Sequence, residues 1–305
     1  MIRYRTPPWL IFSYIRILAF LFFRRGPKAK FPEGLAVTVG GLRTTRSELR
    51  SYNTLVGAAG SVDTIPVLFP HVMLSSTQIR LMSLSSFPYS ILGAVHYRNR
   101  ILQHATMWLD DTYVGTVTLR PVRLLEKGVE WEMFSTICVE GSSRVVWEEL
   151  SVFYAKGRFT KTPSLPSAPL LVPLSKTTDR ETTRTHEWRI PHSMGRAFGI
   201  LTGDINPIHM HWSFAKLFGL PSDVAHGMCA LGNLVHALEP SITESSSLPV
   251  EVQCAFKGPL GLGKNTTTSV VGNRLDMYIQ GNELPVLLGK IETNSKTLSL
   301  KNETA

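Results

Sequence analysis

The sequence predicts an α+β protein made of two halves with the same order of elements, and three observations support this. Over residues 90–156, strand-like stretches separated by turn residues, with polar–apolar alternation at 130–134 and 144–150, are typical of an antiparallel sheet. A proline-rich stretch, residues 157–181, follows this sheet and is typical of a linker. From Thr182 onward a strand, a helix and further strands recur, which indicates an internal duplication. We therefore expect one unit over 35–156 and a second over 182–305.

Residues 1–34 are a basic, strongly apolar segment. The first 32 residues contain five Arg and two Lys and no acidic residue. The apolar run within them, residues 9–23, is shorter than the roughly 20 residues that cross a hydrocarbon core, and Arg16 lies in its middle. Three interpretations stay open: attachment to a membrane surface through residues 9–25, packing on the protein itself, and mitochondrial targeting. The expected location is cytoplasmic with membrane association, and mitochondrial is the alternative.

In the first half, a sheet is expected to wrap one helix. Apolar side chains recur at loosely helical spacing over residues 74–84, and Phe87-Pro88 ends that helix. A shorter helix is expected near residues 47–55. The strands are expected at 91–100, 107–113, 114–125, 129–139 and 145–154.

The second half repeats this order. A helix that starts near Gly227 has a broad apolar face and corresponds to the long helix of the first half. The polar residues 295–305 are expected to be frayed. The strands are expected at 185–190, 248–256, 266–271, 274–280 and 286–294.

The stretch GILTGDINPIHMHWSFA, residues 199–215, carries the strongest local signals. Asn206 followed by Pro207 is typical of an N-cap and a first helical residue, and predicts a helix to about Phe218. His209 would then lie in the first turn and Asp204 just before the cap, so both side chains could converge. The helix dipole disfavours imidazolium there and keeps His209 in the neutral form that a general base needs. The alternative is that Asp204 and Asn206 only cap the helix.

A second stretch, Ala225-His226-Gly227-Met228, opens the next helix. The N–H of Gly227 would point out of that helix start with no side chain in the way, as a donor for an oxygen that gains negative charge. His226 is either a further polar group there or structural, and we favour the structural role. A carboxylate, a neutral imidazole and an amide donor are the groups needed to add or remove water β to a thioester carbonyl.

Other kinds of site are less well supported. Residues two apart on a helix point about 200° away from each other, so His209 and His211 cannot easily share an ion, and no metal site is expected. The three cysteines, Cys138, Cys229 and Cys254, form neither a disulfide framework nor a zinc ligand set, and fit a reducing compartment.

The motif residues resemble those of a known family. That family is the MaoC-like dehydratases with their hydratase 2 motif, which include R-specific enoyl-CoA hydratases and the dehydratase parts of multifunctional β-oxidation proteins and fatty-acid synthases. The resemblance implies a double hot-dog fold, in which each unit is a long helix wrapped by an antiparallel sheet. The residues that carry it are Leu201-Thr202-Gly203-Asp204-Ile205-Asn206-Pro207-Ile208-His209, Ala215 and His226-Gly227-Met228.

Carried over by position, the resemblance implies that Asp204 and His209 are the catalytic pair. Asn206 supports the same loop, and Gly227 is the oxyanion donor. The first half resembles the family more weakly over residues 66–101. There His71 falls where His226 does, but Val72 replaces the glycine and Leu49 stands where an aspartate would be. The first half is therefore expected to be catalytically silent.

The implied reaction is the reversible hydration of trans-2-enoyl thioesters to (R)-3-hydroxyacyl thioesters, without metal or redox cofactor. Acyl-CoA is the expected substrate, acyl carrier protein the alternative carrier, and a non-catalytic acyl-binding scaffold the alternative from another class. The net charge of +9 suits such anionic partners, and Arg196 and Lys257 are candidates for the CoA phosphates or are solvated. A nucleic acid is not expected, and the chain would act as a monomeric pseudo-dimer or a homodimer.

Overall fold

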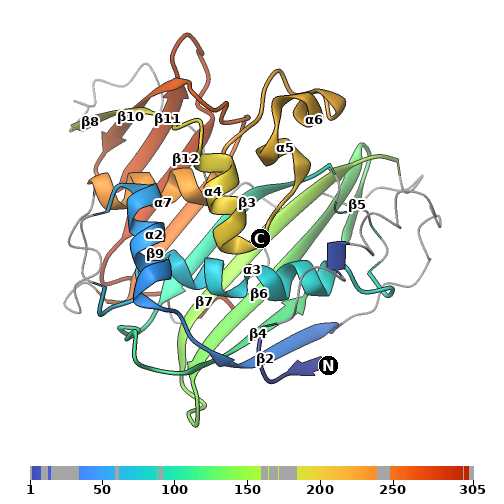
Figure 1. Cartoon of the computed structure of the whole chain (residues 1–305), viewed down its shortest axis with the longest axis vertical. Helices are drawn as coiled ribbons and strands as arrows, with labels where there is room; N and C mark the ends of the chain where they lie inside the picture. Colours follow the sequence, from blue (N-terminus) through green and yellow to red (C-terminus); the bar gives the residue numbers. More distant parts are fainter. Residues whose placement is uncertain are drawn as a thin grey trace.

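The structure is a computed structural model of the chain (Figure 1). It describes residues 2–7, 13–14, 34–58, 62–158 without 88, 90 and 92, the single positions 164 and 171, 184–238, and 248–301 without 298. The predicted linker and most of the predicted anchor at 9–25 lie outside the described residues. No helix within the described part is both long and apolar enough to cross a bilayer.

The described residues of the first half form more strand than helix. Two elements are helical, α2 (Arg46–Val56) and α3 (Phe69–Met82). The strands are β1 (Ile2–Tyr4), β2 (Ala36–Leu42), β3 (Ala94–Gln103), β4 (Tyr113–Leu119), β5 (Arg123–Leu125), β6 (Gly128–Val139) and β7 (Val145–Lys156).

The second half repeats the long helix and the five principal strands. The helices are α4 (Met194–Thr202), α5 (Pro207–Met210), α6 (Trp212–Leu217) and α7 (Gly227–Leu238). The strands are β8 (Arg184–Arg189), β9 (Val250–Phe256), β10 (Asn265–Val271), β11 (Arg274–Ile279) and β12 (Leu287–Glu292).

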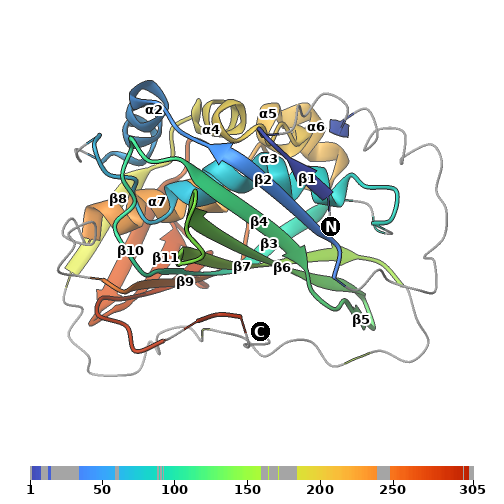
Figure 2. The ribbon, with the colours of Figure 1, turned by 90° about the horizontal axis from the view of Figure 1, so that it is seen from below.

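All strands of the described residues join one sheet. Its order is β1-β2-β4-β6-β7-β3-β9-β12-β11-β10-β8, with β5 paired to β6 beside this path. The order β2-β4-β6-β7-β3 of the first half is mirrored by β9-β12-β11-β10-β8 in the second. The halves meet where β3 pairs antiparallel with β9, in the register Asn99↔Cys254. The helices lie on one face of this curved sheet (Figure 2). The α+β class is thereby confirmed.

The long helices α3 and α7 bury their apolar faces against the sheet. Leu74 of α3 and Leu231 and Leu234 of α7 are all fully buried. Close approach of α3 depends on Gly115 of β4, because a Cβ added there would lie 2.5 Å from Leu74 Cδ2. The hydrophobic effect of these side chains supplies the main stabilisation of each half.

Three sequence-based expectations about elements were wrong. The helix expected over 74–84 begins at Phe69, with Pro70 in its first turn, where the missing N–H costs nothing. The strand expected over 107–113 is a turn region apart from one bridge at Trp108. The helix expected from Pro207 to Phe218 is broken, as described below.

His211 breaks that helix because its backbone is extended, with φ −158° and ψ 141°. Its side chain accepts a hydrogen bond from Ser213 N–H and so caps the separate helix α6. The break changes which side chains face inward: Ala215 is buried, whereas Trp212 is half exposed.

The segment after β12 is fastened to the sheet as far as Lys301, although it was expected to be frayed. It runs along the face opposite the helices (Figure 2). Thr297 Oγ1 donates to Glu251 Oε2 at 2.7 Å, and Ser299 Oγ donates to Glu148 Oε1 at 2.8 Å. Leu300 is fully buried. The carboxylates of Glu251 and Glu148 face this segment, and their hydrogen bonds explain why polar residues after β12 are held on the sheet.

Candidate active site

The segment from Gly203 to His209, here called the motif loop, packs against helix α4. Two glycines of that helix, Gly195 and Gly199, make this close packing possible. A Cβ added to Gly195 would lie 2.4 Å from the carbonyl oxygen of His209. A Cβ added to Gly199, one turn later, would lie 2.7 Å from the carbonyl oxygen of Asp204. Both contacts are shorter than any real Cβ tolerates, so only glycine lets the loop approach α4 this closely.

Local hydrogen bonds hold the loop between α4 and α5. Asp204 N–H donates to Thr202 Oγ1 at 3.2 Å, and Asn206 N–H donates to Asp204 Oδ1 at 3.1 Å. The Asn206 side chain accepts from Ile208 N–H, with Pro207 at the first helical position. The predicted N-cap is thereby confirmed, although the helix it caps is short.

Tyr14 joins this loop from far away in the sequence. Its hydroxyl donates to Gly203 O at 2.5 Å and accepts from Ile205 N–H at 2.9 Å, so it holds the backbone on both sides of Asp204. Burial and the nearby Asp204 carboxylate raise the pKa of Tyr14, which stays a neutral donor. Ser13 is fully buried. At these two residues the apolar N-terminal segment therefore contacts the protein itself.

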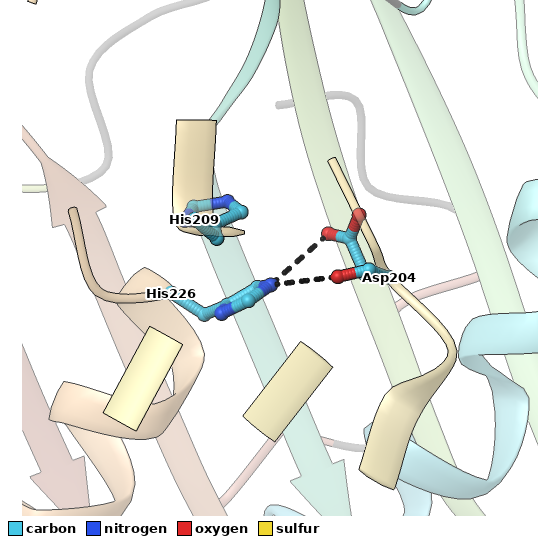
Figure 3. Close-up of side chains that lie close together, drawn as sticks. All are labelled: Asp204, His209 and His226. Carbon is cyan, nitrogen blue, oxygen red and sulfur yellow. Dashed lines mark hydrogen bonds and ion pairs between the residues drawn. The ribbon is translucent and has the colours of Figure 1, made fainter. Parts of the chain in front are cut away.

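Asp204, His209 and His226 form one cluster (Figure 3). His226 Nε2 lies 3.3 Å from the carbonyl oxygen of Asp204 and 3.5 Å from its Oδ2. The rings of His209 and His226 are stacked with centroids 3.6 Å apart. His209 Nδ1 lies 2.8 Å from Val224 O, so Nδ1 carries the proton and Nε2 is left as an acceptor. His226 completes the group, although sequence patterns favoured a structural role for it.

The cluster keeps the carboxylate charged and the imidazole neutral. Burial and the charge of His226 lower the pKa of His209 to about 4. Burial alone would raise the pKa of Asp204, but the hydrogen bond and charge of His226, together with His209, hold it below its ordinary value. The Asp204 side chain remains 39% exposed, so a molecule in the cavity can reach it. Desolvation, rather than the helix dipole, is the main cause of the neutral His209.

The three side chains also place their ligand atoms within 4.8 Å of one another, which would suit a metal ion by distance. The two imidazole planes, however, are stacked at an angle of only 25°. The nitrogen lone pairs lie in two nearly parallel ring planes, so they do not converge on a point 2.0–2.1 Å from both nitrogens, as zinc needs. The geometry favours proton transfer over metal binding.

Gly227 is the first residue of α7 and lines the same cavity. Its N–H has no partner within the helix, as at every helix start. A Cβ added there would lie 2.5 Å from the ring of Phe256, so this ring excludes any side chain. Among the described residues no hydrogen-bond acceptor is bonded to this N–H, which leaves it available to a ligand oxygen.

The cavity holds about 540 Å³ and is lined mainly by apolar atoms. It is bounded by Asp204, His209 and Gly227 from the second half and by α3 and β3 from the first. Lys257 is exposed and lines it, whereas Arg196 is exposed on α4 away from its lining. His211 is exposed and bonded to Ser213, outside this group.

In the first half, Leu49 stands at the position that corresponds to Asp204 and is fully buried in α2, and Val72 follows His71 inside α3. The three cysteines are free thiols, and burial raises the pKa of Cys229, which makes it a poor nucleophile.

Similarity to known proteins agrees with this geometry. A family model described as MaoC like domain matches residues 173–283. Residues 173–283 thus form a domain of the MaoC-like dehydratase family. The chain is similar to 3-hydroxyacyl-thioester dehydratase X of Mycobacterium tuberculosis, with 26% identity over 192 residues, 63% of this chain and 65% of that protein. It is also similar to a peroxisomal enoyl-CoA hydratase 2 of Arabidopsis thaliana, with 30% identity over 105 residues, 32% of this chain and 29% of that protein.

The chain thus spans less than two thirds of the length of each of these relatives. A solved structure of HtdX from Mycobacterium tuberculosis has a TM-score of 0.69 at 21% identity, and the match covers 85% of this chain and 99% of that chain. This likeness shows the fold, which is the predicted double hot-dog.

Proposed function

We propose that the protein hydrates trans-2-enoyl thioesters to (R)-3-hydroxyacyl thioesters and catalyses the reverse dehydration. The observation that carries this proposal is the convergence of Asp204, His209 and the Gly227 amide on one largely apolar cavity. The names of the two relatives, a 3-hydroxyacyl-thioester dehydratase and an enoyl-CoA hydratase, support it.

In the proposed reaction, water is held between Asp204 and His209. His209 Nε2 takes one proton as the water oxygen bonds to C3, and the charge that develops on the thioester oxygen is stabilised by the Gly227 N–H. The proton then returns from His209 to C2, so the base is regenerated and no cofactor is consumed. His226 keeps the Asp204 carboxylate turned toward this water.

The carrier group would lie at the exposed end of the cavity. Lys257 is exposed and lines the cavity, and it could meet a phosphate of coenzyme A or the phosphopantetheine of an acyl carrier protein. We propose acyl-CoA as the substrate, and comparing kcat/KM for matched CoA and carrier-protein thioesters decides between them.

The reaction is tested with crotonyl-CoA and longer enoyl-CoA thioesters. Their hydration is measured as the loss of enoyl absorbance. Asp204→Asn and His209→Ala should each lower kcat about 10²- to 10⁴-fold with an unchanged circular dichroism spectrum. Wild type that binds acyl thioesters but hydrates none of any length would instead be an acyl-binding scaffold.

A further inference from the structure

The part of the cavity beside the first half carries polar side chains that the proposed reaction does not use. Helix α3 lines the cavity with His71, Ser75, Gln78, Ile79 and Met82, which share one face of the helix. The first three, here called the acceptor belt, are polar and precede two apolar residues. A cavity that took only a hydrocarbon chain would gain nothing from burying these polar groups.

The belt is held by a buried carboxylate behind it. Glu149 of β7 is fully buried. It accepts hydrogen bonds from His71 Nδ1 at 2.6 Å, Gln78 Nε2 at 2.8 Å and Asn99 Nδ2 at 2.7 Å. These bonds fix the orientation of the His71 and Gln78 side chains. The N–H groups that point at Glu149 are used in these bonds.

The atoms that Glu149 leaves unused are acceptors. In the tautomer whose proton on Nδ1 is donated to Glu149, His71 keeps Nε2 as an acceptor. With Nε2 of Gln78 turned to Glu149, its Oε1 remains. The Ser75 hydroxyl donates to the carbonyl oxygen of His71 at 2.8 Å and keeps its lone pairs. Among the described residues, no other hydrogen bond reaches these three atoms.

The belt lies close to the proposed reaction centre. The His71 ring stacks on His96 with centroids 5.8 Å apart. His96 in turn lies 5.5 Å from the ring of Phe256, which packs against Gly227. An acyl chain that leaves the reacting carbons toward Ile79 and Met82 therefore passes the belt.

We propose that the acceptor belt binds a hydroxyl group on the acyl chain, so that the substrates include enoyl thioesters hydroxylated beyond the reacting carbons. This inference rests on the proposed function. A hydroxyl supplies the proton that three acceptors need, whereas a keto oxygen supplies none. A carboxylate would be repelled by Glu149, whose pKa the bonds from His71 and Asn99 hold below its ordinary value despite its burial.

Binding to the full-length protein tests the belt without relying on turnover. Calorimetry would compare decanoyl-CoA with a series that carries one hydroxyl, or one keto oxygen, on each carbon beyond the fourth. At least one hydroxyl position should bind about three- to tenfold more tightly than decanoyl-CoA, and the keto series should show no gain.

Two variants locate the effect. Ser75→Ala removes one acceptor and breaks only a bond to its own helix, and His71→Phe removes a second acceptor. Both should lose the hydroxyl preference and keep decanoyl-CoA binding within about threefold. Ser83→Ala is the matched control, because Ser83 also donates to its own helix, at Arg80 O, but does not line the cavity. It should keep the preference.

The proposal is wrong if no hydroxyl position binds more tightly than decanoyl-CoA, if the keto series gains equally, or if Ser75→Ala keeps the full preference. Should His71→Phe fail to fold, Ser75→Ala still decides. Hydration of the corresponding enoyl thioesters is measured separately. A preference without hydration would contradict the proposed reaction alone, and hydration of unsubstituted substrates without a preference would contradict the belt alone.

Discussion

His209 illustrates how far one residue could be anticipated. Its spacing from Asp204 indicated a neutral base beside a carboxylate, and the structure brings both to one cavity. The reason for its neutrality is burial and the stacked His226, 17 residues away in sequence. No local pattern encodes that stacking, because it depends on how the segment before α7 meets α5, where Val224 N–H donates to Ile208 O at 3.1 Å.

The pH dependence of the proposed reaction follows from His209. A base whose pKa is about 4 stays unprotonated above about pH 5, so kcat/KM should be level from there to neutral pH and fall as pH approaches 4. Steady-state rates with circular dichroism at each pH would measure this. An ordinary histidine would instead lose activity below about pH 7.

Tyr14 is the residue whose contribution no motif could reveal, because 189 positions separate it from Gly203. Tyr14→Phe removes both bonds to the Asp204 loop and should lower kcat about 5- to 30-fold, with KM and melting temperature nearly unchanged. Tyr4→Phe is the control, since that hydroxyl accepts from Arg80 Nε at 2.7 Å, away from the site. Equal kcat in the two variants would show that Tyr14 does not position the loop.

At the scale of elements, strand and helix types followed from periodicity, and the misjudged ones have local causes. His211 interrupts a helical pattern because its extended backbone allows its ring to cap α6. Residues 107–113 were expected to form a strand, but they turn before β4 begins at Tyr113, and the Tyr113 hydroxyl donates to Trp108 O across that turn. In both places local side-chain contacts determine the backbone.

The close packing of α4 against the motif loop can be tested by adding one methyl group to a glycine of α4. Gly199→Ala places a Cβ 2.7 Å from Asp204 O, so the loop must move and kcat should fall about tenfold or more. Gly40→Ala is the matched control, because an added Cβ meets nothing closer than 3.9 Å there. If both variants keep the wild-type rate, the close approach of α4 does not position Asp204.

At the scale of the whole molecule, the duplication and its single motif were readable from the sequence, and the sheet order confirms the two-fold arrangement. The acceptor belt was not readable. Its members come from α3, Glu149 comes from β7, and Asn99, which also donates to Glu149, comes from β3, so the group depends on the pairing of β3 with β7.

The tail on the outer face should make stability depend on acid pH. Burial would raise the pKa of Glu251, but the bonds from Arg100, Thr297, Gln253 and Ser295 lower it to about 2. Its contribution, about 1–3 kcal/mol, is therefore present above about pH 4.5 and is lost as pH falls toward 2. Urea unfolding from pH 7 to 3 would measure it, and Glu251→Gln should flatten that slope. Equal slopes would rule out Glu251 as the cause.

The pairing of β3 with β9 also has a consequence for how the site responds to dilution. In a dimer of separate hot-dog subunits, the chemical groups and the opposite cavity wall would part as the concentration fell below the dissociation constant. Here the two walls are parts of one polypeptide, so their local concentration is set by the chain. Specific activity should therefore stay constant over any range of enzyme concentration. The two cavity walls, which belong to the two duplicated halves, can also differ from each other in sequence.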